Sequence, residues 1–594
     1  MSSVLAPVSI PAPPASSPMR LVDALRILRQ PAADAEPFEI ELLCGFTPLH
    51  LETFLAAHVQ LLLPQGNRVA TRTGLFGDLA GNLRRLAAQE SVAAAILLEW
   101  SDLDPRLGLR NLGGWGPGAV EDILQHAQAK AAEYGDLIRQ LPKSIQVAVS
   151  LPTLPLPPVD TVPGWQSGVF ELSLRSIVAS LAVTMARRPH TRVVNAQRID
   201  SLSPMGQRFD PRSEIIGGFP YTASHAVAVA AQLARLLVKN TPLKGIITDL
   251  DDTLWNGIVG EVGPDQVHWD LDNKSVIHGL YQQTLKALAA QGTLVAVASK
   301  NDAAVVERAF ERPDLVLPKD RLFPMEVHWG PKSGSVSRIL AKWNIGADAV
   351  VFIDDNPAEL AEVKQAHPNV ETILFPKNNP QAAVELLERL RDLFGKETVS
   401  DEDRFRLDSL RQAGAAMGEG EPGQISESFL ENAEAEIRMV YRKDPDDPRP
   451  FELVNKTNQF NLNGLRLTET AWRERLSRPD TVLQVVNYGD KFGPLGRIGV
   501  LLGHKEGDVL TVESWVLSCR AFSRRIEFQC LHQLFEEHGV NRLRFAFVPT
   551  AKNGPLQTFL QQFFEVPLAP GMELTADRFR AVSPKLYHRV TSDS

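Results

Sequence analysis

The sequence has few cysteines and no long basic or apolar run. Three cysteines among 594 residues cannot form a disulfide framework, which is typical of a reducing compartment. No Lys/Arg tract stands out and the formal net charge is −9, so a nucleic-acid partner is not indicated. No apolar run reaches the roughly 18 residues of a membrane helix, and the start lacks the basic and apolar regions of a signal peptide. These absences predict a cytoplasmic protein without a membrane or nucleic-acid partner.

The composition is that of a globular protein too long for one hydrophobic core. Hydrophobic residues make up 44% of the chain and charged residues 22%, and the length predicts three or four domains. Residues 1–20, rich in Pro, Ala and Ser, are expected to be a disordered tail. The polar stretch 396–432 is expected to be a helical linker with a flexible break. The domains would then be 21–241, 242–395 and 433–594.

Short apolar runs alternate with amphipathic stretches in the first of these domains. "FEIELLCGF" and "AAAILLEW" have the pattern of strands, and "VEDILQHAQAKAAEYGDLIRQL" has that of a helix. Alternation of this kind predicts an α/β sheet domain. Residues 433–594 mix strands such as "RIGVLLGH" with helices such as "RRIEFQCLHQLFEEHG", which predicts an α+β domain.

The second domain has near-continuous apolar strands, "GIITDL", "TLVAVASK", "AVVFIDD" and "VETILFP". Such strands are buried on both faces and therefore belong to a mainly parallel sheet. Ligands of such sheets bind at the carboxyl ends of the strands. Polar residues fall at those ends here, in the blocks "DLDDT", "SKND" and "DDNPAE".

The stretch "GIITDLDDTLWNG" brings Asp249, Asp251 and Asp252 close together after an apolar strand. Like charges at this spacing are unfavourable unless a cation lies among them. Asp249 and the backbone near Asp251 can face one metal ion, and a third carboxylate can come from "VVFIDDNPAE". An all-oxygen ligand set is typical of Mg²⁺.

These residues suit phosphoryl transfer. Asp249 would attack phosphorus, and Asp251 would protonate the leaving oxygen and later activate water. Ser299 and Lys332 would hold the phosphoryl oxygens, together with further residues of the same blocks: Thr253, Lys300 and Asn301. The alternative is a structural acid cluster or an ordinary Asp-rich turn.

The four blocks "DLDDT", "SKND", "GPKSGS" with Lys332, and "VVFIDDNPAE" occur in this order over about residues 244–376. They resemble the motifs of the haloacid dehalogenase (HAD) superfamily, subfamily IIIC. Within the last block, Asp355 matches the usual metal ligand of that superfamily better than Asp354 does. The resemblance implies a Rossmannoid parallel sheet and a Mg²⁺-dependent phosphatase. The intervals between Asp251, Ser299 and Lys332 leave no room for a large cap domain. A site without a cap suits a bulky substrate, or a small one held by a neighbouring domain.

A narrower resemblance rests on "DLDDTLWNGIVGEVG", "ASKND", "FIDDNPAE", "NKTNQFN" and "SWVLSCR". These strings resemble the FkbH-like family, in which such a phosphatase domain is fused to an acetyltransferase-like (GNAT-like) domain. The resemblance implies that a glyceryl unit from 1,3-bisphosphoglycerate is dephosphorylated and loaded as a thioester onto the phosphopantetheine arm of an acyl carrier protein in polyketide-type biosynthesis. The alternatives are a phosphatase acting on another phosphorylated intermediate and a non-catalytic docking scaffold.

Cys519 follows the apolar run "DVLTVESWVL", the strand along which acetyltransferase folds place the pantetheine arm. A thiolate there could attack an acyl phosphate, with Arg520 and the following helix start lowering its pKa. A buried apolar cysteine is the equal alternative. The turn "RAFSRRIE" lacks the glycines that bind coenzyme A pyrophosphate, which favours a carrier-bound arm. Arg520, Arg524 and Arg525 could contact an acidic carrier surface or the substrate phosphate, or be simply solvated.

The remaining candidates are open or structural. "NKTNQFNLNG" is either a capping and turn cluster or a contact for the carrier or glyceryl group, whereas Cys44, Cys530, His532 and His538 are expected to be structural. The N-terminal domain faintly resembles SGNH hydrolases. Its first strand ends in "CGFTPLH" without a serine nucleophile, so His225 of "YTASH" cannot complete a triad. We expect an inactive scaffold or docking module.

Overall fold

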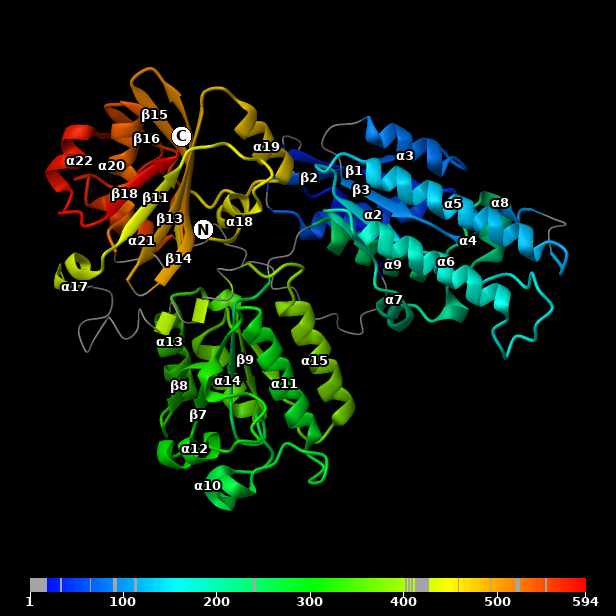
Figure 1. The fold of residues 1–594 in the computed structure, drawn as a ribbon, viewed down its shortest axis with the longest axis horizontal. Coiled ribbons are helices and arrows are strands. Elements are labelled where there is room, and N and C mark those ends of the chain that lie inside the picture. The colour runs from blue at the N-terminus through cyan, green and yellow to red at the C-terminus, as the bar shows by residue number, and fades with distance from the viewer. Residues whose placement is uncertain are drawn as a thin grey trace. The chain divides into compact units, whose positions relative to one another are not determined.

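The computed structural model (Figure 1) describes most of the chain. The described residues are 19–31, 35–64, 66–88, 93–111, 115–238, 242–400, 403, 406–407, 410–411, 427–457, 459–491, 493–518, 524–550 and 553–593. The chain divides into two compact units, Pro13–Asn240 and Thr241–Ser594, which are described separately. Most of the predicted tail and most of the predicted linker lie outside the described residues.

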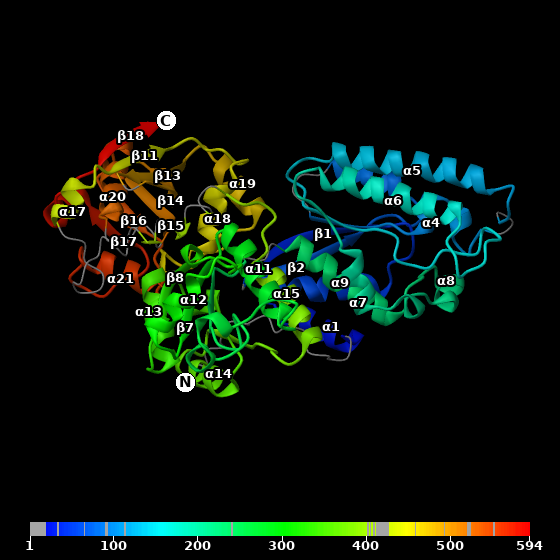
Figure 2. The same ribbon diagram turned by 60° about the horizontal axis from the view of Figure 1, so that its bottom comes forward.

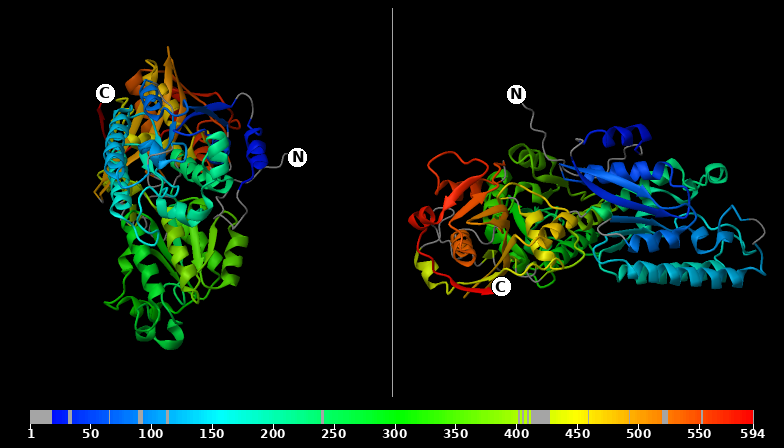
Figure 3. Two further views of the ribbon diagram at one scale, coloured as in Figure 1. Left: turned by 90° about the vertical axis from the view of Figure 1, so that its right-hand side faces the viewer. Right: turned by 90° about the horizontal axis from the view of Figure 1, so that it is seen from above.

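The first unit contains the predicted α/β sheet. Its five parallel strands lie in the order β2 (Asn67–Thr73), β1 (Glu36–Cys44), β3 (Ala93–Leu97), β4 (Val147–Ser150) and β5 (Thr191–Val193). One face is covered by α1 (Leu21–Leu28), α2 (His50–Leu62) and α9 (Ala223–Leu237), and the other by α3 (Leu79–Ala87), α5 (Val120–Gln140) and α6 (Val169–Ala186) (Figures 2 and 3). The short helices are α4 (Trp100–Leu103), α7 (Ala196–Leu202) and α8 (Pro211–Gly217).

In the described part of the chain, one helix, α6, is long and apolar enough to cross a membrane. The sequence had predicted no apolar run of that length. Phe170, Leu174, Ile177, Leu181 and Met185 form its buried face. These side chains pack into the same hydrophobic cluster as α3 and α5. The helix is therefore accounted for as one layer of the α/β unit.

The second unit begins with a five-stranded parallel sheet. Its order is β10 (Glu371–Leu374), β9 (Val350–Asp354), β6 (Gly245–Thr248), β7 (Leu294–Ser299) and β8 (Leu322–Val327). Helices α11 (Val276–Ala290) and α15 (Pro380–Phe394) pack on one face, and α13 (Lys332–Trp343) and α14 (Pro357–Ala366) on the other. The parallel, doubly covered sheet is as the apolar strands predicted. Between β6 and β7 lie only α10 (Val259–Val262), one short 3₁₀ turn and α11, so there is no cap domain there.

The remaining part of this unit is a mixed sheet. Its strands run in the order β17 (Met572–Thr575), β16 (Arg542–Phe545), β15 (Val509–Leu517), β14 (Gly493–Glu506), β13 (Thr481–Asp490), β11 (Glu436–Val440) and β18 (Arg589–Asp593). The helices are α17 (Glu427–Asn432), α18 (Pro448–Lys456), α19 (Glu469–Ser477), α20 (Ile526–His538), α21 (Gly554–Gln561) and α22 (Ala576–Val582). The predicted α+β character is confirmed.

The eighth strand, β12 (Phe460–Asn461), lies beside the end of β15. Strand β15 pairs with β16 over Val509–Val512, and further along it pairs instead with β12 at Val516 and Leu517. The Leu462 amide donates to the Trp515 carbonyl at 3.0 Å, and the Val548 amide donates to the Leu462 carbonyl at 3.2 Å. The chain's own backbone therefore fills the space where β15 and β16 separate. A pantetheine arm was expected along this strand, so it would have to displace β12 or bind elsewhere.

Asparagine side chains hold β12 in this position. The Asn553 amide donates to the carbonyls of Asn461 at 2.9 Å and Val548 at 3.0 Å. The Asn463 amide donates to the carbonyls of Glu513 at 2.8 Å and Ala546 at 3.0 Å. The described asparagines of "NKTNQFNLNG" are thus structural, which favours the first of its two interpretations.

Replacing Asn553 should loosen this part of the fold. The side chain is fully buried, and Asn553→Ala would leave two buried carbonyls without donors. We expect the free energy of opening of the mixed sheet to fall by about 2 kcal/mol or more. Hydrogen exchange at the amides of Leu462 and Val548 measures this. Asn541→Ala, which removes an exposed amide bonded to Asp508, is the matched control, and equal protection in both variants would contradict the assignment.

Candidate functional site

The polar blocks meet at the carboxyl edge of β6, β7 and β9. Asp249 follows β6, Ser299 ends β7, and Asp354 ends β9. Because β6 lies between β7 and β9, these three strand ends are neighbours. Lys332, the first residue of α13, joins them through its side chain. The structure therefore brings residues from all four sequence blocks to one edge of the sheet.

The same blocks end the strands and begin the helices. The Asp302 side chain accepts from the Ala304 amide at 2.8 Å and caps α12 (Ala303–Phe310). The Asn356 side chain caps α14 in the same way, with Pro357 at the first helical position. These caps satisfy amides that the first helical turn leaves free. The reactive side chains thus stand on short, well-capped turns.

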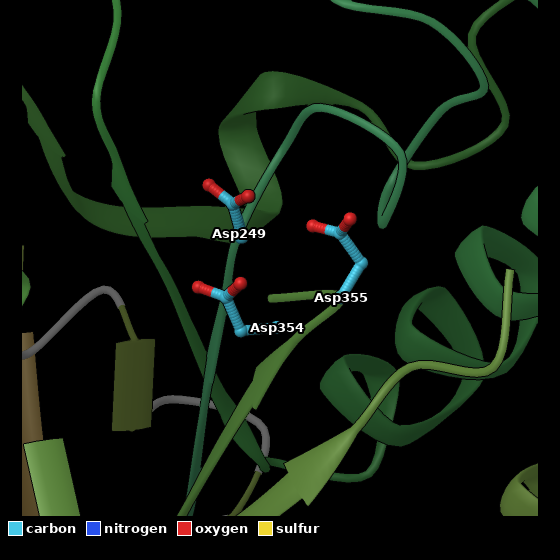
Figure 4. Close-up of side chains that lie close together, drawn as sticks. All are labelled: Asp249, Asp354 and Asp355. Carbon is cyan, nitrogen blue, oxygen red and sulfur yellow. The ribbon is translucent and has the colours of Figure 1, made fainter. Parts of the chain in front are cut away.

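Three carboxylates form the centre of the site. One oxygen atom each of Asp249, Asp354 and Asp355 lies within 4.8 Å of the other two (Figure 4). Asp249 and Asp354 are buried. Asp249 Oδ1 has no hydrogen-bond donor among the described residues. A buried carboxylate oxygen that accepts no hydrogen bond, in a cluster of three carboxylates, is the kind of ligand that divalent cations bind.

The Lys332 ammonium lies between two of these carboxylates. Its Nζ is 2.6 Å from Asp354 Oδ2 and donates a hydrogen bond to it. The same Nζ is 3.0 Å from Asp249 Oδ1, close enough for an ion pair but off the direction of a hydrogen bond. Burial raises the pKa of Asp249 to about 7 against the opposing attraction of Lys332. Burial by itself lowers the pKa of the Lys332 ammonium, but the attraction of the two carboxylates outweighs this effect and raises the pKa above its usual value. Lys332 is therefore a fixed positive charge.

The Asp251 carboxylate is held by three donors. Its Oδ1 accepts from the Trp255 indole at 2.9 Å and from the Val259 amide at 3.0 Å. Its Oδ2 accepts from the Asn301 amide at 2.9 Å. The Val259 bond ties Asp251 to the start of α10. The Asp251 carboxylate is not one of the three clustered carboxylates, so its predicted part in metal binding rests on its backbone oxygen.

The other predicted residues differ in their surroundings. Ser299 is buried, and its hydroxyl accepts from the Asn301 amide at 3.2 Å. Thr253 is fully buried, and its hydroxyl has no partner among the residues described. Lys300 lies 2.6 Å from Glu359 Oε1 and is therefore paired outside the carboxylate centre. Cys519 and Arg520 lie outside the described residues.

Sequence reasoning missed Lys377. Its Nζ lies 2.7 Å from Asp252 Oδ2 and 2.8 Å from Asp355 Oδ2, and so it links the first and fourth blocks. Lys377 follows β10, which lies beside β9. Its position one strand away from the motif follows from the order of the strands in the sheet. The turn "FPKNNP" carries no chemical pattern of its own.

His225 of the first unit is part of a buried network. Its Nε2 lies 2.8 Å from Thr153 Oγ1 and its Nδ1 lies 2.9 Å from Ser203 Oγ. The Thr153 hydroxyl in turn donates to Glu99 Oε1 at 2.7 Å. The imidazole is completely buried, and burial lowers its pKa to about 3. A neutral histidine closed off from solvent in this way is a structural group.

Removing the Lys332 charge should destabilise the site. Lys332→Met would leave Asp249 and Asp354 buried without their cation, at a cost of about 3–5 kcal/mol of unfolding free energy. Because Mg²⁺ could take over the neutralising role, it should recover part of this loss. Denaturation with Mg²⁺ and with a chelator measures both effects. Lys377→Met, which removes a more exposed ammonium, should lose less. Equal stability of the wild type and the Lys332 variant in chelator would contradict this arrangement.

Comparison with known proteins shows a likeness of fold. No protein-family model and no curated protein sequence matches the chain. A solved structure does match: the N-terminal part of a Bacteroides fragilis protein, containing a phosphatase domain and complexed with Mg. The identity is 19% and the TM-score 0.50, over 64% of this chain and 100% of the other. The matched 64% of this chain is longer than residues 242–395 alone, so the similarity of fold extends to a further part of the chain. The chain thus shares the fold of a protein that contains a phosphatase domain.

Proposed function

We propose that the parallel-sheet part of the second unit hydrolyses phosphate esters with Mg²⁺ as its cofactor. The observation that carries the proposal is the buried Asp249 carboxylate, whose Oδ1 lacks a hydrogen bond and lies beside the ammonium of Lys332. A buried nucleophile next to fixed positive charge suits attack on a phosphoryl group. The solved structure of similar fold supports the proposal, since it contains a phosphatase domain complexed with Mg.

The residues present fit a magnesium ion. Asp249 and Asp355 would supply carboxylate oxygens, with Asp354 beside them and the backbone oxygen of Asp251 as the expected further ligand. All of these are oxygen donors, as Mg²⁺ prefers. When bound, the ion would offset the negative charge of the phosphoryl group.

The chain's own residues divide the reaction between them. An Asp249 oxygen forms a bond to phosphorus as the bond from phosphorus to the leaving oxygen breaks, which gives a phospho-aspartate. Asp251 gives its proton to that leaving oxygen and afterwards takes one from the water that releases phosphate. Its three donors hold the carboxylate in one orientation throughout. Lys332 and Ser299 offset the charge on the phosphoryl oxygens.

Phosphate release should depend on Asp249. Asp249→Asn replaces the nucleophile by an amide, and we expect phosphate release to fall by about a thousandfold or more. A chelator should have the same effect on the wild type. Asp272→Asn, a change at an exposed aspartate after β6, should leave the rate unchanged. Undiminished release by the Asp249 variant in metal-free buffer would refute the proposal.

The finer proposal is glyceryl transfer. In it, the chain takes a glyceryl unit from 1,3-bisphosphoglycerate, removes phosphate, and loads the unit onto an acyl carrier protein as a thioester. The resemblance of the sequence blocks to the FkbH-like family supports this function, and so does the position of Cys519 after β15. The two described cysteines are poor alternatives. Burial raises the pKa of Cys44 to about 12 and raises that of Cys530 further, and a thiol that stays protonated is a weak nucleophile.

Cys519 should carry the acyl group. Incubation with 1,3-bisphosphoglycerate should add the mass of a glyceryl or phosphoglyceryl group, visible by intact-protein mass spectrometry and removable with hydroxylamine. Cys519→Ala should abolish both this adduct and carrier loading, whereas Cys530→Ala, at a buried cysteine, should not. Phosphate release at Asp249 should persist in both variants. An adduct that survives in the Cys519 variant would assign the acyl group to another residue.

One observation favours a simpler function. Strand β12 fills the space beside β15 where a thiol arm was expected, which suits a phosphatase that acts on another intermediate without a carrier. That enzyme would turn over fully in the absence of carrier protein. A non-catalytic scaffold, the other alternative, would release no phosphate at all.

A further inference from the structure

Exposed apolar side chains occur on two segments that flank the carboxylate centre. Ile258 and Val262, at the two ends of α10, are 42% and 44% exposed, and Trp329 is 74% exposed. Single exposed apolar residues are common on protein surfaces. An indole left this open three residues before Lys332 is a different case, because tryptophan is usually well buried.

Both segments are attached to the end of β7. The Val259 amide donates to Asp251, which is itself bonded to Asn301 just after β7. On the other side, the His328 amide donates to the Ser299 carbonyl at 3.1 Å. The loop 328–331 then leads directly into Lys332. Trp329 and the α10 side chains thus belong to segments that border the same site.

The loop that carries Trp329 is braced. The Gly330 amide donates to His328 Nδ1 at 2.9 Å, and His328 Nε2 lies 3.0 Å from Ser335 Oγ in the first turn of α13. Lys332 anchors the end of the loop between two buried carboxylates. An aromatic side chain on a fixed loop binds a ligand with little loss of conformational entropy.

We propose that Trp329, with Ile258 and Val262, binds the organic part of the substrate while its phosphate lies at Asp249. This inference rests on the proposed phosphatase function, in the form that acts on an intermediate other than 1,3-bisphosphoglycerate. It names the substrate class: phosphate monoesters with a neutral aromatic or extended apolar part beyond the phosphate. No cap domain lies between β6 and β7 to enclose such a substrate, so these side chains supply the contact. Trp329 is then a specificity-determining residue.

The test compares two non-hydrolysable ligands, phenylphosphonate and methylphosphonate, in the presence of Mg²⁺. Binding of each to the full chain is measured by isothermal titration calorimetry, which needs no turnover. Phenylphosphonate should bind the wild type more tightly. Trp329→Ala should weaken the binding of phenylphosphonate by about three- to tenfold and leave the binding of methylphosphonate unchanged. Trp329→Phe should retain most of the affinity for phenylphosphonate.

Trp165→Ala is the matched control, because Trp165 is 88% exposed and belongs to the other unit. It should bind both ligands as the wild type does. Three results would overturn the inference: equal weakening of both ligands by Trp329→Ala, no weakening of either, or no binding of phenylphosphonate to the wild type. Phosphate release from any ester, measured separately, tests the proposed function, so the two can fail independently.

Discussion

The ion pair of Lys332 with two buried aspartates is the interaction on which the site depends. Carboxylates at the ends of apolar strands are strongly disfavoured by desolvation, and one ammonium placed between Asp249 and Asp354 offsets much of this. The pairing is possible because β6 lies in the middle of the sheet and α13 begins at its carboxyl edge. The charge balance of the site therefore depends on both the order of the strands and the position at which α13 begins. The clustered carboxylates outnumber the Lys332 ammonium, so a metal cation can still bind among them.

The parallel sheet and most of the site could be predicted from the sequence. Apolar strands of the second unit are followed directly by their polar residues, so Asp249, Ser299 and Asp354 are placed by local pattern alone. Lys377 could not be placed in this way, because its partners Asp252 and Asp355 lie far away in the chain. Pairing between side chains on separate strands depends on sheet order, which periodicity does not encode. Lys300 shows the same limit, since its partner Glu359 is on α14.

In the mixed sheet, the local sequence pattern was not enough to predict what the asparagines do. The asparagines of "NKTNQFNLNG" have the composition of a binding loop or a turn, and both uses were open. The Asn463 amide instead donates to backbone carbonyls that lie 50 and 83 residues away along the chain. The Asn461 carbonyl accepts from the Asn553 amide, 92 residues away. Strand β12 is two residues long, too short for any periodic signal. Long-range hydrogen bonds of this kind become visible only when the sheet is assembled.

The bond between the Val259 amide and Asp251 links a short helix to the site. One hydrogen bond fixes both the start of α10 and one oxygen of the Asp251 carboxylate. A displacement of α10 would therefore remove one of the three donors of that carboxylate. The position of α10 and the orientation of Asp251 cannot change independently.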